Sequence, residues 1–183
     1  MPVQASKVHA SRAYKKVTKV THLNIIRKSD TNIAITANTM DNVSNYQGTK
    51  ELLIAVVEKD GAILMRKKPE GTPPYKETWY SLGCDRNPEK KDEDTIIDYL
   101  KETFGITVHS VVNRGQDEEI KMDHDGIIKR FIYTDFDCLY LSGELKKPEG
   151  IEKLQWIPKD ELPQYDIVPP SRKLFGKLGF VGF

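Results

Sequence analysis

Residues 79–106 constrain the fold most strongly, because they read in succession as a strand, a charged loop and an amphipathic helix. A short strand over residues 79–82 leads into a predicted turn at Gly83. The acidic start of the segment at residues 92–103 suits the positive end of a helix dipole, and Gly105 suits its C-terminal stop. Apolar residues recur at i, i+1, i+4 and i+8, which places one apolar stripe on this helix: Ile96, Ile97, Leu100 and Phe104.

The flanking sequence predicts a domain in which strands dominate. A hairpin turn is expected at Lys59-Asp60-Gly61, because Asp-Gly suits the positive φ that such turns require. A terminal helix is expected over residues 171–178, with Ser171 as its N-cap. Together these features predict an α+β fold with a mixed β-sheet between helices. The expected strands are residues 51–58, 62–67, 107–113, 127–134, 137–142 and 151–157.

Residues 84–106 resemble the signature of the Nudix family, G-x5-E-x7-R-E-U-x-E-E-x-G-U, in which U is a bulky aliphatic residue. The late segment LQWIPKDELP, residues 154–163, is also similar to the usual end of such domains. The resemblance implies a Nudix fold over residues 49–183. Laid on the sequence without gaps, the signature is matched at Leu100, Glu102, Gly105 and Ile106, and is not matched at Cys84, Lys90, Asp98, Tyr99 and Thr103.

The mismatched positions mostly serve the chemistry of the family. Nudix enzymes hydrolyse a nucleoside diphosphate linked to another group, and the resemblance implies Mg²⁺ or Mn²⁺ held by helix carboxylates. Tyr99, Glu102 and Thr103 stand where the family has three glutamates, and only Glu102 keeps a carboxylate. Lys90 replaces the earlier loop glutamate with the opposite charge. Glu102 is therefore the one catalytic candidate that remains on this face.

Asp98 stands where the family has arginine and lies i,i+4 to Glu102. Two interpretations of this pair stay open. Asp98 and Glu102 could share a weakly held metal ion at the rim of the site. Alternatively they belong to a solvated helix face, which Lys91 and Lys101 are near enough to neutralise.

Four residues are candidates for contact with a ligand: Tyr75, Tyr99, Lys90 and Arg86. Tyr75 lies in a Pro-rich loop, and its ring could stack on a base. For Tyr99 the alternative is packing in the core. A predicted loop after residue 113 carries the acids of residues 117–119 and 123–125, which could supply a general base or form a plain solvated turn.

Residues 1–29 contain no Asp or Glu and hold seven Lys and Arg side chains. Within a predicted extension over residues 1–48, which also carries short strands, a basic arm could lie on phosphates. The alternatives are a solvated tail and an organelle-targeting leader. The candidate nucleic-acid contacts are Lys7, Arg12, Lys15, Lys16 and Lys19.

These observations favour a Nudix-fold protein that binds a nucleotide, an RNA or a protein partner, with hydrolysis lost or weak. The alternatives are a divergent metal-dependent pyrophosphohydrolase and a purely structural subunit, and a homodimer is also open. No apolar run approaches the roughly 18 residues of a membrane span. Two cysteines do not make a disulfide framework, so we expect an intracellular, cytoplasmic protein, with an organelle left open.

Overall fold

A computed structural model describes residues 46–180 and 182–183 of the chain. The predicted basic arm and short strands of the extension over residues 1–48 fall almost wholly outside these residues. They stay predictions, as does the boundary near Gly48. Within the described part of the chain, no helix is long and apolar enough to cross a membrane.

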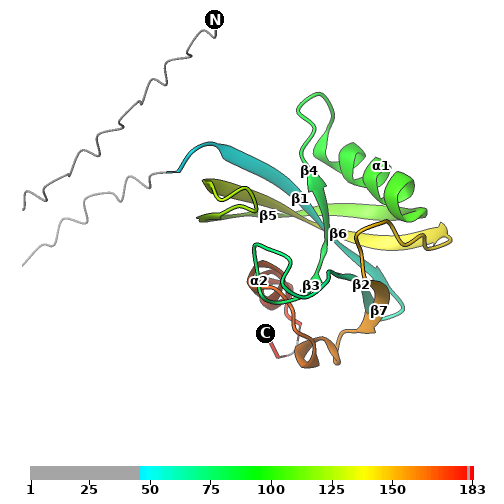
Figure 1. The fold of residues 1–183 in the computed structure, drawn as a ribbon. Coiled ribbons are helices and arrows are strands. Elements are labelled where there is room, and N and C mark those ends of the chain that lie inside the picture. The colour runs from blue at the N-terminus through cyan, green and yellow to red at the C-terminus, as the bar shows by residue number, and fades with distance from the viewer. Residues whose placement is uncertain (1–45, 181) are drawn as a thin grey trace, which may run out of the picture. The chain divides into compact units, whose positions relative to one another are not determined.

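A seven-stranded sheet forms the centre of the described domain (Figure 1). Its main path runs β3-β2-β1-β6-β5, with β4 paired to β1 and β7 paired to β2. The central pair, β1 with β6, is parallel, and the other named pairs are antiparallel. The predicted mixed sheet is therefore confirmed. The strands are β1 (Thr49–Lys59), β2 (Ala62–Lys67), β3 (Trp79–Tyr80), β4 (Leu82–Asp85), β5 (Ile106–Met122), β6 (Ile128–Gly143) and β7 (Lys153–Pro158).

Alternation along β1 divides the core into two layers. Leu53, Ala55 and Val57 pack with α1 (Asp92–Phe104), whereas Val56 packs with α2 (Pro169–Lys177) and with the short 3-10 turn η1 (Leu162–Gln164). Successive side chains of a strand point to opposite faces, so one strand serves both layers. Figure 1 shows α1 and α2 on opposite faces of the sheet. The predicted sheet between helices is thus also observed.

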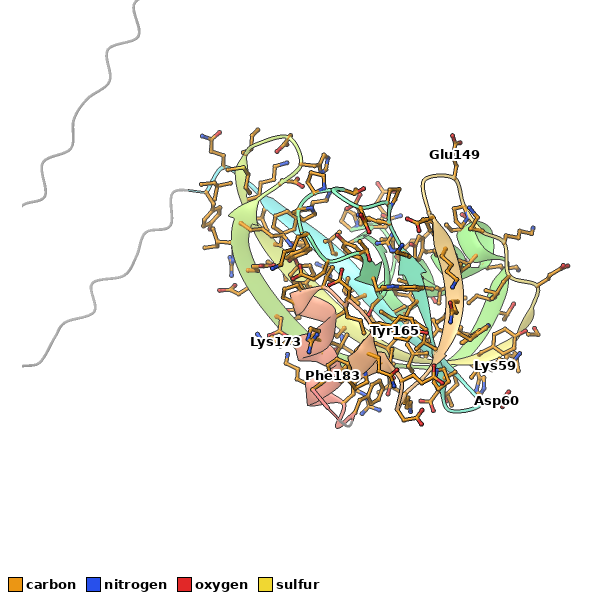
Figure 2. All side chains as sticks on the ribbon, turned by 60° about the horizontal axis from the view of Figure 1, so that its bottom comes forward. Lys59, Asp60, Glu149, Tyr165, Lys173 and Phe183 are labelled. Atoms are coloured by element: carbon orange, nitrogen blue, oxygen red, sulfur yellow. The ribbon has the colours of Figure 1, made fainter. Side chains whose placement is uncertain are left out.

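The predicted β1–β2 hairpin turn is present. Asp60 and Gly61 both have positive φ, 49° and 78°, which is the backbone that the Asp-Gly pair favours. Figure 2 shows Lys59 and Asp60 at this turn, at the outer edge of the domain.

The predicted helix is α1, and it ends as expected at Gly105, whose φ is 73°. The end of α1 also meets the end of β6. A Cβ atom added at Gly105 would lie 2.5 Å from the Glu144 carbonyl oxygen, and one at Gly143 would lie 2.3 Å from the Gly105 carbonyl oxygen. Both positions therefore require glycine, because the two backbones leave no room for a side chain.

Two strands are longer than predicted. β5 was expected to end at Asn113, but it continues to Met122 because β6 supplies partners across residues 115–122, after register shifts near Asn113. The acids of residues 117–119 therefore lie on a strand and not in a loop. β6 is one strand where two were expected, because Asp135 pairs in register with Ile54 and Gly115 and does not break the strand.

Two local predictions were wrong. Gly83 lies within β4 and not in a turn; a Cβ atom there would lie 2.9 Å from the Leu53 carbonyl oxygen, so glycine lets β4 approach β1. Ser171 is not the N-cap of α2. The helix begins earlier, after Val168, because two prolines suit its first turn. Ser171 instead accepts a hydrogen bond from the Ser81 amide at 3.2 Å.

Candidate functional site

The outer face of α1 carries the positions at which the family signature places glutamates. Glu102 is exposed, Thr103 is half-buried, and Tyr99 packs its ring edge-on to Phe104 with 5.5 Å between centroids. Burial raises the pKa of the Tyr99 hydroxyl. The structure thus places Tyr99 against the core, and only Glu102 offers a solvent-facing carboxylate at these three positions.

Lys90 and Asp98 form an ion pair, with 2.9 Å between Lys90 Nζ and Asp98 Oδ2. In the family signature these two positions carry glutamate and arginine, so the charges are exchanged between the loop and the helix. The bond to Asp98 raises the pKa of Lys90. The pair joins the loop to α1, and it occupies both a predicted ligand contact and a predicted metal ligand.

Arg86 is held at the other end of the same loop. Its guanidinium donates to Asp92 and to Glu51, each at 2.8 Å, and these hydrogen bonds raise its pKa. The Nε and one terminal nitrogen of the Arg86 guanidinium are therefore engaged by carboxylates of the protein itself. The structure does not bring Arg86 or Lys90 into contact with Tyr75.

The resemblance implies a divalent cation, but the residues on this face do not fit one. Among the described residues, no three His, Cys, Asp or Glu side chains gather as a metal site. Asp98 is engaged by Lys90, and Glu102 alone cannot supply the several oxygen ligands that Mg²⁺ prefers. No step of a reaction is therefore assigned to a protein-held metal.

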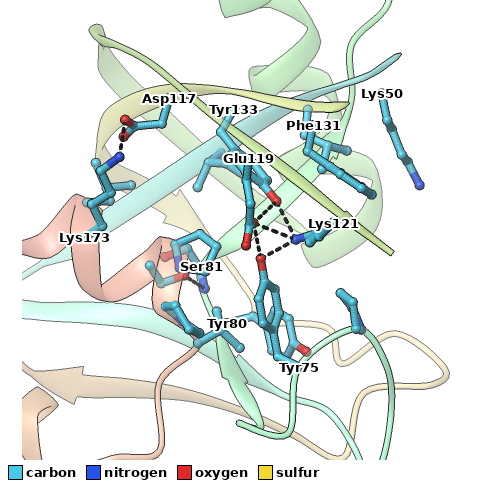
Figure 3. A pocket seen from close by; sticks show the side chains of 18 of the residues that line it. Lys50, Tyr75, Tyr80, Ser81, Asp117, Glu119, Lys121, Phe131, Tyr133 and Lys173 are labelled. Atoms are coloured by element: carbon cyan, nitrogen blue, oxygen red, sulfur yellow. Dashed lines mark hydrogen bonds and ion pairs between the residues drawn. The ribbon is translucent and has the colours of Figure 1, made fainter. Parts of the chain in front are cut away.

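A pocket of about 440 Å³ opens on the opposite face of the sheet, beside α2 (Figure 3). Its lining combines apolar strand residues with cations and aromatic rings, the usual composition of a small-molecule site. The aromatic residues that line it are Tyr75, Tyr80, Phe131 and Tyr133. Five basic side chains, Lys50, Arg66, Lys68, Lys121 and Lys173, line it together with five carboxylates, Asp117, Glu118, Glu119, Asp123 and Asp135. Of the predicted ligand contacts among the described residues, Tyr75 alone lines this pocket. Residues of the segment considered for a general base line it as well: Asp117, Glu118, Glu119, Asp123 and His124.

Tyr75 belongs to a network at one side of the pocket. Its hydroxyl donates to Glu119 Oε2 at 2.5 Å, and Lys121 Nζ donates to the hydroxyls of Tyr75 and Tyr133. Burial works to raise the pKa of Glu119, but hydrogen bonds from Tyr75 and Lys121 outweigh it and leave the pKa below its usual range. Figure 3 shows these four side chains converging from the loop and from two strands.

Lys121 lies within a cage of aromatic rings. Its Nζ atom is 4.0 Å from the Tyr75 ring centroid, 4.5 Å from that of Phe131 and 5.3 Å from that of Tyr133. Cation–π attraction of this kind can hold a cation in place of water. Burial nevertheless lowers the pKa of Lys121, and Glu119 opposes that shift.

Lys68 differs from Lys121 because it has no carboxylate partner among the described residues. Its Nζ atom lies 4.5 Å from the Tyr80 ring centroid. Burial lowers its pKa, and the charges of Arg66, Lys50 and Lys121 lower it further. An anion bound beside Lys68 would relieve the repulsion that this unpaired cation experiences from its basic neighbours.

The acids that could have supplied a general base are all engaged. Asp117 accepts from Lys173 at 2.7 Å and from Lys177, which ties β5 to α2 (Figure 3). Glu118 pairs with Arg130. Asp123 pairs with Lys129 at 2.8 Å and with His124 at 2.7 Å in the turn between β5 and β6.

Sequence reasoning missed most of the pocket, because its residues come from strands distant in the chain. One signal was present in β6: Phe131, Tyr133 and Asp135 recur at every second position, which places them on one face of a strand. The paired alternation of Glu119 and Lys121 on β5 is a second signal. Both were hidden by the expectation of a loop and of a break in the strand.

Comparisons with known proteins agree with this architecture. No protein-family profile matches the chain. The nucleoside triphosphatase NudI of Escherichia fergusonii is 22% identical over 138 residues, which cover 72% of this chain and 98% of that protein. A MutT Nudix hydrolase structure from Burkholderia pseudomallei has a TM-score of 0.58 at 21% identity, over 73% of this chain and 98% of that one.

A third relative was solved with a ligand. The Nudix domain of Shewanella oneidensis NrtR, in complex with ADP-ribose, has a TM-score of 0.55 at 13% identity, over 78% of this chain and 92% of that one. The mixed sheet between helices, with its loop and α1, is thus the Nudix fold. The sequence similarity to NudI, over nearly the whole length of that protein, agrees with this fold.

Proposed function

We propose that this Nudix-fold domain binds a nucleotide in the pocket beside α2 and hydrolyses it slowly or not at all. The observation that carries the proposal is Lys68, a half-buried cation with no carboxylate partner among the described residues, in a pocket that four aromatic rings also line. Aromatic faces suit a base and cations suit phosphates, and a nucleotide offers both. The relative that binds ADP-ribose supports a ligand of this type.

Slow hydrolysis follows from the face of α1. Lys90 and Asp98 neutralise each other, Tyr99 is packed on Phe104, and Glu102 stands alone. Groups that stabilise developing charge commonly contribute orders of magnitude to a rate, so their loss should leave little turnover. Any divalent cation would then be coordinated by the phosphates of the ligand and not by carboxylates of the protein.

The competing function is a divergent pyrophosphohydrolase. It is favoured by the retained, exposed Glu102 and by relatives described as nucleoside triphosphatases. The test is product release from nucleoside triphosphates, nucleotide sugars and capped RNA with Mg²⁺ or Mn²⁺. Turnover near the ordinary enzyme range of roughly 1 s⁻¹ or more, lost in Glu102→Gln, would establish the enzyme and overturn our proposal.

The interpretation of α1 can also be tested by restoring the carboxylates of the signature and measuring whether metal binding is gained. Lys90→Glu, Tyr99→Glu and Thr103→Glu together would place new carboxylates beside Glu102. We expect measurable Mn²⁺ binding by calorimetry in a variant that remains folded by circular dichroism. A folded variant that binds no Mn²⁺ would contradict the alignment of the signature on this helix.

Binding of RNA by the basic arm remains a separate proposal. If residues 1–29 contact phosphates, each neutralised phosphate adds about 0.7 to 0.9 to the slope of log affinity against log salt. Deleting residues 1–29 should then flatten the slope for a single-stranded RNA probe. An unchanged slope after deletion would assign the arm to some other role.

A further inference from the structure

Asp135 is the most deeply buried ionisable side chain that lines the pocket, with 3% of its surface exposed. It lies on β6 between Ile54 of β1 and Gly115 of β5, neither of which offers a polar side chain. No described residue donates a hydrogen bond to its carboxylate, and burial raises its pKa to about 6. Buried carboxylates are normally paired, so this one requires an explanation.

Two hydroxyls in the same pocket share this property. Tyr80 and Ser81 are 8% and 4% exposed, and neither the Tyr80 hydroxyl nor the Ser81 Oγ has a hydrogen-bond partner in the described part of the chain. These two oxygens are closed to solvent, and the Asp135 carboxylate is not among the solvent-inaccessible atoms. Asp135 is therefore the unpaired group that a polar ligand in this pocket could reach, and a donor on that ligand would offset the cost of its burial.

A role for Asp135 in the fold alone is the alternative. The nearest cations, Lys173 and Lys177 of α2, both bind Asp117 and not Asp135. The connection between β5 and α2 is therefore complete without the Asp135 carboxylate. Lys177 and Lys173 attract the Asp135 carboxylate through space, but no described residue donates a hydrogen bond to it.

We infer that Asp135 reads the base of the bound nucleotide and selects a base with two adjacent N–H donors on one edge, as guanine has. An ionised carboxylate has two acceptor oxygens and no donor, so it can accept both guanine N–H groups side by side. Adenine presents one donor beside one acceptor on its corresponding edge, and hypoxanthine presents a single N–H donor. The inference rests on the proposed nucleotide function and adds its base preference.

Protonation should change the preference. A protonated Asp135 offers one donor and one acceptor, which matches the adenine edge and not the guanine edge. The charged groups that face Asp135 are Asp117 from β5 and Lys173 and Lys177 from α2, while its β1 neighbour Ile54 is apolar. These three groups pair with one another. His124, beside Asp123, also lines the pocket, so the effect of pH is assigned to Asp135 by comparison with Asp135→Asn.

The experiment is calorimetric titration of the full-length protein with GDP, IDP and ADP at pH 7.5. We expect GDP to bind roughly tenfold or more tightly than ADP, with IDP between them, since each charged hydrogen bond is worth at least a tenfold change in affinity. Asp135→Asn, which keeps the shape and supplies one donor and one acceptor, should reverse the order of GDP and ADP. At pH 5 the wild-type preference for GDP should shrink, whereas the ratio in Asp135→Asn should stay constant.

The matched control is Asp137→Asn, two residues along the same face of β6, where the carboxylate pairs with Arg114 outside the pocket. It makes the same change of charge and should leave the order of the three nucleotides unchanged. Equal affinity for GDP and ADP, or an order unaffected by Asp135→Asn, would overturn the inference while leaving nucleotide binding intact. No binding of any of the three would overturn the proposed function and the inference together.

Discussion

The outer face of α1 and the pocket beside α2 belong to one domain but treat charge in opposite ways. On α1, Lys90 and Asp98 neutralise each other, and Arg86 is shared between two carboxylates. In the pocket, Lys68 has no acidic partner and Asp135 has no donor among the described residues. Ion pairs also occur in the pocket, so the difference lies in these two groups alone: the proposed nucleotide site would use the charges that the fold leaves unpaired.

The largest effect is expected on the buried face of α1, where a substitution tests which residues of this helix serve the fold. Phe104→Ala should lower the free energy of unfolding by about 3–5 kcal/mol, because it empties a fully buried aromatic position. Glu102→Gln, two residues away on the exposed face, should change it by less than about 0.5 kcal/mol. Urea denaturation measures both. A large loss of stability in Glu102→Gln would show that the outer face of α1 also serves the fold.

A second prediction concerns the cost of the unpaired acid. An Asp side chain in the unfolded chain has a pKa of about 3.9, and Asp135 in the folded protein has a pKa of about 6. Between these values the folded state holds a proton that the unfolded state has released, so the penalty for ionising Asp135 appears as pH rises through this window. It is complete above about pH 6.

Asp135→Asn removes that penalty. At pH 7.5 the variant should be more stable than wild type by on the order of 2 kcal/mol, and at pH 4 the difference should nearly vanish. Chemical denaturation at the two pH values measures the difference directly. A variant that is less stable than wild type at pH 7.5 would mean that the ionised carboxylate has a partner in the fold.

Lys68→Met tests the unpaired cation by two measurements with opposite expected signs. Affinity for GDP should fall about tenfold, because a charged contact to phosphate is lost. Stability without ligand should stay the same or rise slightly, because the repulsion from Arg66, Lys50 and Lys121 is relieved. Lys101→Met, on the exposed face of α1, is the control for loss of one charge. If Lys68→Met lowered the stability and left the affinity for GDP unchanged, Lys68 would serve the fold and not the binding of a ligand.

The smallest effect is expected from metal removal. Since Glu102 is the only free carboxylate at the three helix positions of the signature, EDTA should change the affinity for GDP by about twofold or less relative to millimolar Mg²⁺. Calorimetry with and without the chelator measures this. A tenfold loss of affinity for GDP on chelation would show that the protein itself holds the metal. In that case the face of α1 and the pocket would both contribute to binding.

The architecture was predictable where local sequence decides it. The stripe from Ile96 to Phe104, the stop at Gly105 and the turn at Asp60-Gly61 all lie where expected, because a few neighbouring residues suffice for them. Tyr75, a predicted ligand contact, lies at the pocket, and its contact with a ligand stays a prediction. Residues such as Lys68 and Asp135 were missed, because their significance depends on partners that only the folded sheet brings near or withholds.

The meeting of Gly105 with Gly143 bears on what the glycine of the signature indicates. Each glycine is held by the backbone of the other segment, so neither can acquire a side chain unless α1 and the end of β6 move apart. Packing alone therefore requires the glycine of the signature, whatever residues the helix face beside it carries. The presence of this glycine in a sequence is thus a sign of the fold and not, by itself, of an activity.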